Sequence, residues 1–489
     1  MKALRYLLPV LASLCVMASC VKPDGPADVA VAGPELISST PEDGASGVAS
    51  GSLTMTLTFD MSVMCPTAQR GRITIDGGAQ IDAVDAYSSD VTVKISALER
   101  GKTYTVFFPS GTIIGYKDNP AADISVSFAT RESSGPSDIV PDPSLSNASA
   151  TAAAKNVYNF LVEHCGVKTL SGVQSSSSNS NDFVDLVYKA TGKHPALAGY
   201  DFIFLQYSPT PAGWSWVQNY SDISAAKEHW NAGGLVSYMW HWNVPDSESA
   251  WKNGTENYNF DGYNFYCDKT SFDINAALTE GTWQNDFIMK DLEEAAGYLG
   301  LLQEAGIPVI WRPLHEAAGN YNKYGSNGAW FWWGRGGAEA CKKLWRLMYD
   351  QFTNVYGLDN LIWVWTVDVT EGCENQYADW YPGNDYVDIV GVDIYENNTG
   401  AKDRQYNALV ELTDGKKLVT VSECGHIPDP EACMAAGNKW SWFMVWPSAD
   451  SSGNLSVTPV DYPLNTLELW NKVMSGPYTL GREDMPSLK

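Results

Sequence analysis

From about residue 148 to the end, the chain alternates apolar, strand-like runs with amphipathic stretches, and this alternation constrains the fold more than any other feature. Stretches such as Asp291 to Gln303 and Ala338 to Phe352 have apolar residues three and four apart, as in helices that pack on one face. Eight such units predict an α/β fold, the (β/α)8 barrel, for residues 148–489. The eight expected strands are Thr169 to Val173, Ala196 to Phe202, Gly234 to His241, Pro308 to Glu316, Leu361 to Val367, Val387 to Tyr395, Leu418 to Glu423 and Trp442 to Trp446.

An open doubly wound sheet is the other fold that this alternation allows, and it would carry a glycine-rich phosphate-binding loop. The one glycine cluster of interest, Gly334-Arg335-Gly336-Gly337, follows an aromatic run and lacks a Lys-Ser/Thr pair. A nucleotide site is therefore not predicted.

The N-terminal part has a different composition, since the first Trp is Trp214 and the first His is His164. Residues 35–130 contain short alternating runs, such as Leu53 to Phe59, separated by turn residues, a pattern typical of an all-β sandwich. The segment from Ser39 to Ala45, followed by Leu57-Thr58-Phe59-Asp60, resembles the bacterial immunoglobulin-like modules of surface proteins. Residues 131–147, rich in Ser, Pro and Asp, are expected to form a linker.

The first twenty residues have the pattern of an export signal, with a basic start, an apolar run from Tyr6 to Val16, and the cleavage-site sequence Met17-Ala18-Ser19-Cys20. This arrangement resembles a bacterial lipobox, which implies that Cys20 becomes lipidated. The prediction is an outer-membrane lipoprotein with a signal peptide over 1–20 and a tether over 21–34. An ordinary signal peptide with a chance cysteine is the alternative.

Charge and composition limit the classes of molecule that the protein can bind. The chain has 32 Lys and Arg against 57 Asp and Glu, a net charge of -25, which excludes nucleic acid and disfavours polyanionic polysaccharides. Nineteen Trp and 25 Tyr suit a ligand with apolar faces and hydroxyl edges, as sugars have. Seven cysteines follow Cys20 without a CxxC pair, so we expect isolated buried thiols rather than a zinc or redox motif. We expect a monomer.

Two carboxylates stand where a barrel places its reactive groups, at the C-terminal ends of strands. The expected fourth strand ends in Arg312-Pro313-Leu314-His315-Glu316, and the seventh ends in Ser422-Glu423. Such a pair across the barrel mouth is the arrangement of a retaining glycosidase, in which one carboxyl stays protonated and the other ionised. His315-Glu316 lacks the second His of a zinc protease, and no G-x-S-x-G elbow occurs, so neither a zinc protease nor a serine esterase is expected. Two carboxylates suffice for acid–base and covalent catalysis, so no metal or organic cofactor is expected.

The order of these motifs resembles glycoside hydrolase family 26 of clan A, mostly β-1,4-mannanases. The residues that carry the resemblance are Arg312 to Glu316, Trp330-Phe331-Trp332-Trp333-Gly334, Gly391-Val392-Asp393-Ile394-Tyr395, Ser422-Glu423 and Trp446. The resemblance implies a retaining double displacement on internal bonds of mannan, galactomannan or glucomannan.

The resemblance also implies roles for individual residues. Glu316 would be the acid/base and Glu423 the nucleophile, with His315 holding the acid in position. Tyr395 would donate to the nucleophile, and Arg312 would keep it ionised. The matching positions for sugar contacts are His241, Trp330, Asp393 and Trp446.

Several alternatives stay open at this point. An insertion, Gly319 to Ala329, precedes Trp330 and could wall off one end of the cleft, which would make a mannobiose-releasing exo-enzyme. A β-glucanase or β-1,3-xylanase would use the same mechanism, and a non-catalytic glycan-binding lipoprotein is a rival of another class. Asp201 could be structural or contact a distal sugar, and His241 could be a core histidine. Trp332 and Trp333 are expected to pack at a helix start.

Overall fold

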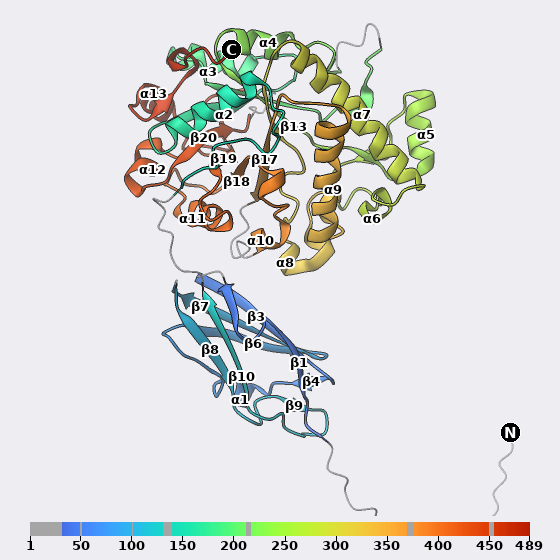
Figure 1. Ribbon diagram of the computed structural model, residues 1–489, viewed down its shortest axis with the longest axis vertical. Coiled ribbons are helices and arrows are strands. Elements are labelled where there is room, and N and C mark those ends of the chain that lie inside the picture. The colour runs from blue at the N-terminus through green and yellow to red at the C-terminus, as the bar shows by residue number, and fades with distance from the viewer. Residues whose placement is uncertain are drawn as a thin grey trace, which may run out of the picture. The chain divides into compact units, whose positions relative to one another are not determined.

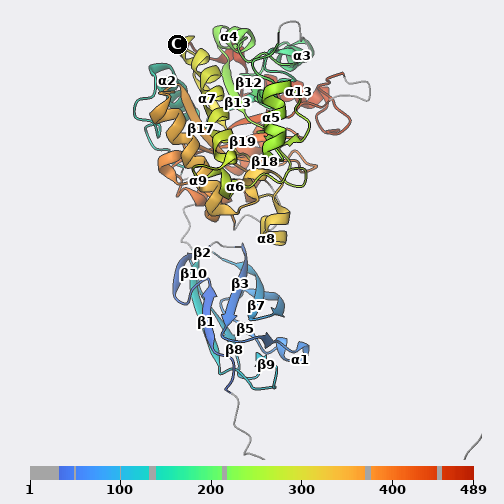
Figure 2. The same ribbon diagram turned by 90° about the vertical axis from the view of Figure 1, so that its right-hand side faces the viewer.

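The computed structural model describes residues 32–48, 51–99, 101–130, 139–211, 217–368, 376–448 and 454–489. The chain forms two compact units, Met1–Glu132 and Ser133–Lys489 (Figures 1 and 2). The expected signal peptide with Cys20, most of the tether, Cys373 and residues 131–138 of the expected linker lie outside the described residues.

The first unit is a sandwich of two four-stranded sheets, which confirms the all-β prediction. Strands alternate buried and outward residues, as in β3, where Met55, Leu57 and Phe59 are buried. One sheet has the order β1 (Leu36–Thr40), β3 (Gly51–Phe59), β7 (Asp90–Leu98), β6 (Gln80–Tyr87), and the other β2 (Ala45–Val48), β10 (Ile124–Thr130), β8 (Thr103–Phe108), β5 (Thr74–Ile75). The short strands β4 (Val63–Met64) and β9 (Ile114–Gly115) pair with each other, and α1 is Thr67–Arg70.

The second unit is a closed barrel of eight parallel strands, as predicted. The pairing between β11 and β12 closes the ring, and the short β21 (Thr479–Leu480) pairs in parallel with the first two residues of β11. The strands, in order around the barrel, are β12 (Leu197–Asp201), β13 (Leu235–Met239), β16 (Val309–Arg312), β17 (Leu361–Asp368), β18 (Ile389–Ile394), β19 (Leu418–Cys424), β20 (Trp440–Val445) and β11 (Thr169–Gln174). Outside the ring, β14 (Val244–Pro245) pairs with β15 (Tyr263–Asn264).

Helices surround the barrel (Figures 1 and 2). The expected helix from Asp291 lies inside the longer α7, and the one from Ala338 begins there as α9. The helices are α2 (Ala152–His164), α3 (Asp182–Thr191), α4 (Ser224–Asn231), α5 (Glu248–Asn257), α6 (Ile274–Ala277), α7 (Trp283–Glu304), α8 (Tyr321–Tyr324), α9 (Ala338–Asp350), α10 (Tyr377–Trp380), α11 (Asp403–Leu412), α12 (Pro430–Ala436) and α13 (Leu467–Ser475). Within the described ranges, no helix is long and apolar enough to cross a membrane.

The described end of the expected linker, residues 139–147, packs on the barrel instead of bridging the units. The backbone N–H of Val140 donates to the carbonyl of Gly415 at 2.9 Å, and that of Ser146 donates to Asp388 Oδ1 at 2.6 Å. These bonds make the segment part of the barrel unit, in agreement with the division after Glu132.

Two strands end two or more residues earlier than predicted, and β12, β18 and β20 each end one residue earlier. Strand β16 stops at Arg312 instead of Glu316, because Pro313 has no N–H to continue the ladder. The chain then turns, with positive φ angles at Leu314 (49°) and Glu316 (52°). Strand β13 likewise stops at Met239, two residues before His241. Both chemically important residues therefore lie just beyond a strand rather than in it.

The cysteines of the described ranges are free thiols, as expected. Five are buried, and Cys165 is partly buried. The free cysteines are Cys65, Cys165, Cys267, Cys341, Cys424 and Cys433.

Candidate active site

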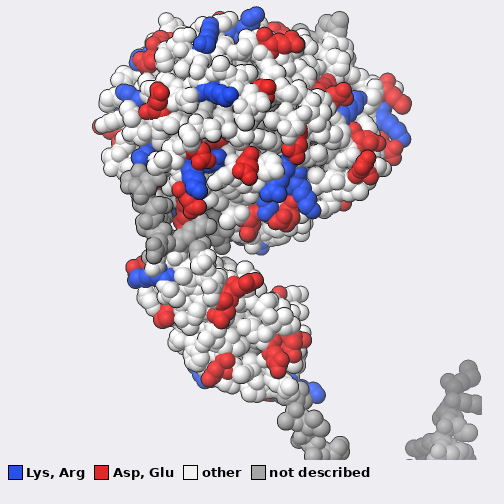
Figure 3. Space-filling model, in the orientation of Figure 1, with Lys and Arg blue, Asp and Glu red and all other residues white. Residues whose placement is uncertain are grey.

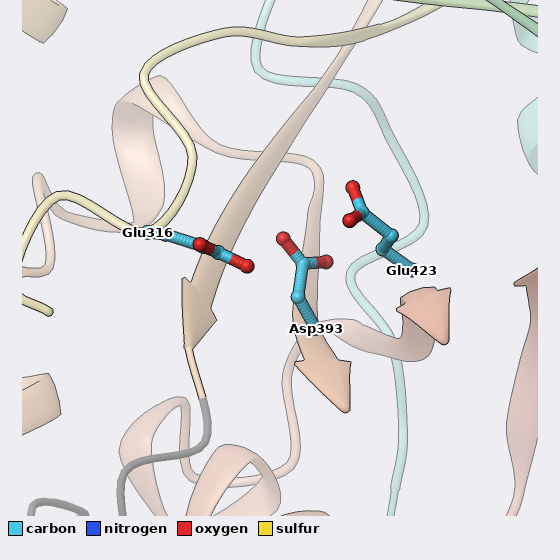
Figure 4. Close-up of side chains that lie close together, drawn as sticks. All are labelled: Glu316, Asp393 and Glu423. Atoms are coloured by element: carbon cyan, nitrogen blue, oxygen red, sulfur yellow. The ribbon is translucent and has the colours of Figure 1, made fainter. Parts of the chain in front are cut away.

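Three carboxylates from neighbouring parts of the barrel rim converge on one point. Glu316 follows β16, Asp393 lies near the end of β18, and Glu423 near the end of β19, directly beside Asp393 in the strand register. One oxygen of each lies within 4.8 Å of the others (Figure 4). All three side chains are buried. A spacing this short fits the retaining geometry, about 5 to 5.5 Å, rather than the inverting one.

Arg312 joins two of these carboxylates from the end of β16. Its Nη1 donates to Asp393 Oδ2 at 2.8 Å, and its Nη2 donates to Glu423 Oε2 at 2.6 Å. Burial opposes the guanidinium charge, but Asp393 and Glu423 outweigh it and raise the pKa of Arg312. Three clustered carboxylates could ligate a metal ion, but here two of their oxygens already bind this guanidinium, which compensates their charge.

The second oxygen of Glu423 accepts a hydrogen bond from the hydroxyl of Tyr395, which follows β18. Burial, reinforced by the charge of Glu423, raises the pKa of Tyr395 well above its usual value, so the hydroxyl keeps its proton. Glu423 is thus held by a donor on each oxygen, with a positive charge on one side. Both contacts hold this carboxylate in one orientation.

Glu316 has the opposite electrostatic surroundings. Burial raises the pKa of its carboxyl well above the usual value, and the negative charges of Asp393 and Glu423 raise it further. Its backbone N–H donates to the carbonyl of Thr366 at 3.2 Å, which fixes the turn that carries it. The pKa of one carboxyl of the pair is therefore raised, whereas its partner is bound by a guanidinium and a hydroxyl.

His315 is a buried neutral imidazole. Burial lowers its pKa well below the usual value, and His241 and Arg312 lower it further. Its Nδ1 is buried and forms no hydrogen bond with the described residues. The indole N–H of Trp333 donates to the carbonyl of His315 at 3.0 Å, which anchors the residue next to Glu316.

His241 lies at the same site rather than in the hydrophobic core. Its ring centroid is 4.6 Å from that of His315, at a steep angle. Its Nδ1 lies 2.6 Å from Asp201 Oδ2, so Asp201, at the end of β12, has the structural contact that one of its two interpretations requires.

The site opens into a pocket of about 290 Å³. Trp330 and Trp446 line it, as expected, whereas Asp393 lies behind it against Arg312. Trp332 and Trp333 are fully buried, as packing residues at the start of a short helical turn. The pocket-lining residues are His241, Tyr266, His315, Glu316, Trp330, Phe331, Tyr395, Glu423 and Trp446.

Tyr266 was missed in the sequence. It lies between β15 and α6, two residues after β15 ends, where no periodicity marks a functional residue. A single β-bridge and a stacked ring contact, with centroids 5.9 Å apart, join it to Phe331. The sequence pointed to this part of the site only through the aromatic run that contains Phe331.

The insertion before Trp330 forms α8 and a 3-10 turn, and it closes on itself. The N–H of Asn320 donates to the carbonyl of Gly328 at 2.8 Å, and the side chain of Gln376 donates to the carbonyl of Gly319 at 3.2 Å. Trp330 still lines the pocket, so the insertion does not displace it.

Residues 146–458 match the description of glycosyl hydrolase family 26. The chain belongs to this family. Residues 30–130 match a bacterial Ig-like domain, in agreement with the sandwich. The family 26 domain of an endo-beta-mannanase/endo-beta-glucanase from Prevotella bryantii is 35% identical, with a TM-score of 0.59, over 70% of this chain and 99% of that one. A beta-mannanase from a protist of the termite Reticulitermes speratus, complexed with gluco-manno-oligosaccharide, is 33% identical, with a TM-score of 0.58, over 72% and 99%.

Similar sequences carry the same kind of name. A mannan endo-1,4-beta-mannosidase from Thermothelomyces thermophilus is 37% identical over 62% of this chain and 57% of its own length. Mannan endo-1,4-beta-mannosidase B from Piromyces is 37% identical over 63% of this chain and 49% of its own. The chain thus spans about half the length of these relatives.

Proposed function

We propose that this protein is a retaining endo-1,4-β-mannanase. The observation that carries the proposal is the electrostatic contrast between Glu316 and Glu423, whose oxygens lie within 4.8 Å. Glu316 keeps a proton because of its raised pKa, whereas Glu423 is flanked by Arg312 and Tyr395. Membership of family 26 and relatives named as mannan endo-1,4-beta-mannosidases support the choice of mannan.

The reaction would proceed in two displacements. In the first, Glu423 attacks the anomeric carbon while Glu316 gives its proton to the glycosidic oxygen, so the bond to the leaving sugar breaks as the ester bond to Glu423 forms. In the second, Glu316 takes a proton from water, whose oxygen attacks the anomeric carbon, and Glu423 leaves as a carboxylate. Each carboxyl group returns to its starting state. The chemistry requires only these two side chains and water.

The pocket and the charge distribution suit a neutral sugar chain. Rings of Trp330, Phe331 and Trp446 provide apolar surface, and the neutral His315 provides a polar group without charge. On the face drawn in Figure 3, basic and acidic side chains are interspersed among the described residues, without a continuous basic area. With a net charge of -25, this surface favours mannan over a polyanion.

A timed product profile tests the proposal. Linear β-1,4-mannan, galactomannan, mixed-linkage β-glucan and β-1,3-xylan would be digested by the full mature chain. Mixed manno-oligosaccharides at the earliest times support an endo-mannanase; mannobiose alone indicates an exo-enzyme; activity on glucan or xylan alone overturns the substrate. The variants Glu316→Ala and Glu423→Ala should cleave mannan at least about 100-fold more slowly than the wild type, roughly the contribution of general acid–base catalysis.

A matched control keeps this test specific. Glu294 is a partly buried glutamate on α7 outside the pocket, and Glu294→Gln should cleave mannan at the wild-type rate. If wild type and both active-site variants showed the same turnover, the assignment of the catalysis to Glu316 and Glu423 would be refuted. Binding of mannan by the wild type without any turnover would indicate a glycan-binding protein instead.

For localisation, we propose an outer-membrane lipoprotein, monomeric and anchored through Cys20. The basic start, the apolar run and the Ala-Ser-Cys sequence support it. Palmitate labelling of the wild type and of Cys20→Ala tests it: label in both variants, or in neither, contradicts an anchor at this residue.

A further inference from the structure

Asp201 binds His241 through both of its carboxylate oxygens. Oδ1 accepts from the backbone N–H of His241 at 3.0 Å, and Oδ2 lies 2.6 Å from Nδ1 of its ring. The two residues come from adjacent parallel strands, with Asp201 paired to Met239, so His241 lies two residues further along. One aspartate thus fixes the main chain and the side chain of His241 together.

Asp201 is itself rigid. It is only 8% exposed, and its carbonyl accepts from Ser178 Oγ at 2.8 Å and from the Tyr220 hydroxyl at 3.0 Å. Its backbone N–H donates to Ser178 Oγ at 3.2 Å. The carboxylate is therefore presented to His241 from a fixed position.

These contacts determine the tautomer of His241. Carboxylate oxygens accept hydrogen bonds and Asp201 Oδ2 faces Nδ1, so Nδ1 of His241 carries the hydrogen. In the neutral ring, Nε2 is then left with a lone pair. His241 lines the pocket, and no described residue bonds to its Nε2. The rings of His315, Phe265 and Trp446, with centroids at 4.6, 4.9 and 5.8 Å, pack around the imidazole and oppose its rotation.

We propose that Asp201 is a positioning residue that makes His241 Nε2 a hydrogen-bond acceptor for a hydroxyl of the sugar bound beside Glu316. The identity of that sugar rests on the proposed function. The tautomer of His241 does not, because it follows from the contact with Asp201. Asp201 touches no substrate and acts only through His241.

The variant Asp201→Asn gives a sharp expectation. Its amide oxygen would accept from the His241 backbone N–H, which leaves the amide NH2 facing Nδ1. Nδ1 must then become the acceptor, and the hydrogen moves to Nε2, so the group presented to the sugar changes from acceptor to donor. A misdirected contact of this kind costs about 10- to 100-fold in kcat/KM.

Asp291 provides a matched control. It is another buried aspartate and accepts from the indole N–H of Trp242, the residue next to His241, at 2.8 Å. It lies outside the pocket that contains Glu316, and burial raises its pKa well above the usual value, so the neutral amide of Asp291→Asn resembles it. This variant should leave the His241 tautomer and kcat/KM unchanged.

Nitrogen NMR of the histidine-labelled full chain measures the tautomer, with the His241 signal assigned from its loss in His241→Gln. Wild type should show the hydrogen on Nδ1 and Asp201→Asn on Nε2. Rates on mannohexaose complete a double-mutant cycle, in which Asp201→Asn changes kcat/KM by less than about 2-fold once His241 is Gln. An unchanged tautomer in Asp201→Asn, or losses that multiply in the double variant, overturns the proposal. Because the NMR needs no substrate, a wild type inactive on mannan would refute only the proposed function.

Discussion

Removal of one hydroxyl from the site should slow one half of the reaction more than the other. In Tyr395→Phe, Glu423 loses the donor on Oε1 but keeps Arg312 on Oε2. The ring is partly exposed and its hydroxyl is turned toward Glu423, so the substitution removes a hydrogen bond with little loss of packing. Hydrogen bonds to a charged group contribute about 1.5 to 3 kcal/mol, which corresponds to about 10- to 150-fold in rate.

The direction of the effect follows from where charge develops. In the proposed mechanism, Glu423 is neutral in the glycosyl-enzyme and regains its negative charge as it leaves, so the donor favours the second displacement. For an aryl mannobioside with a good leaving group, we expect kcat and KM to fall together, because the glycosyl-enzyme accumulates. Stopped-flow measurements should then show a burst of phenolate.

Tyr158→Phe is the matched control, because its hydroxyl donates to the carbonyl of Asp142 at 2.9 Å, away from the pocket. It should leave kcat and KM unchanged. An increase of KM in Tyr395→Phe with kcat unchanged and no burst would refute the assignment of this hydroxyl to the leaving nucleophile.

Three further predictions concern charge. Arg312→Met leaves two buried carboxylates without their cation, so the free energy of unfolding measured in urea titrations should fall by about 3 to 5 kcal/mol. The variant should also lose activity. Because the protonated form of Glu316 is required and its pKa is raised, kcat/KM should persist above the usual glutamate range and fall as pH rises through that pKa; Glu316→Gln should remove this basic limb from the pH profile. Burial raises the pKa of Glu294 from 4.5 to about 7, so its contribution to stability is complete below about 4.5 and is lost as pH rises toward 7; Glu294→Gln should flatten the pH dependence of thermal unfolding across that window.

The barrel strands could be predicted because parallel strands covered on both faces appear as continuous apolar runs. In β17, every residue from Leu361 to Asp368 is buried, and the expected strand differs by a single residue. The sandwich could be predicted from the alternation of apolar and polar residues along its strands, as in β3. Both signals are local, so no knowledge of the pairing was needed.

The shape of the turn after β16 could not be predicted. Apolar character continues through Leu314, so the pattern extended the strand to Glu316. The missing N–H of Pro313 ends the ladder, and the positive φ angles that follow depend on bonds such as that between the N–H of Glu316 and the carbonyl of Thr366 on the next strand. A carboxylate expected on a strand therefore reaches the site from a turn, which adds backbone strain at Glu316.

The contact between Asp201 and His241 also could not be predicted from the sequence. It depends on which residues of the two neighbouring strands are paired, and composition does not show that. The two residues are forty positions apart, and each has an ordinary interpretation alone. Only the pairing of Asp201 with Met239 places the carboxylate level with the residues just beyond β13. The same logic joins Asp393 to Glu423, which are paired across β18 and β19. In a parallel barrel, an acidic residue at the end of one strand should therefore be considered together with its register neighbour on the next strand. Equal register brings both side chains to the same rim, where one can position the other.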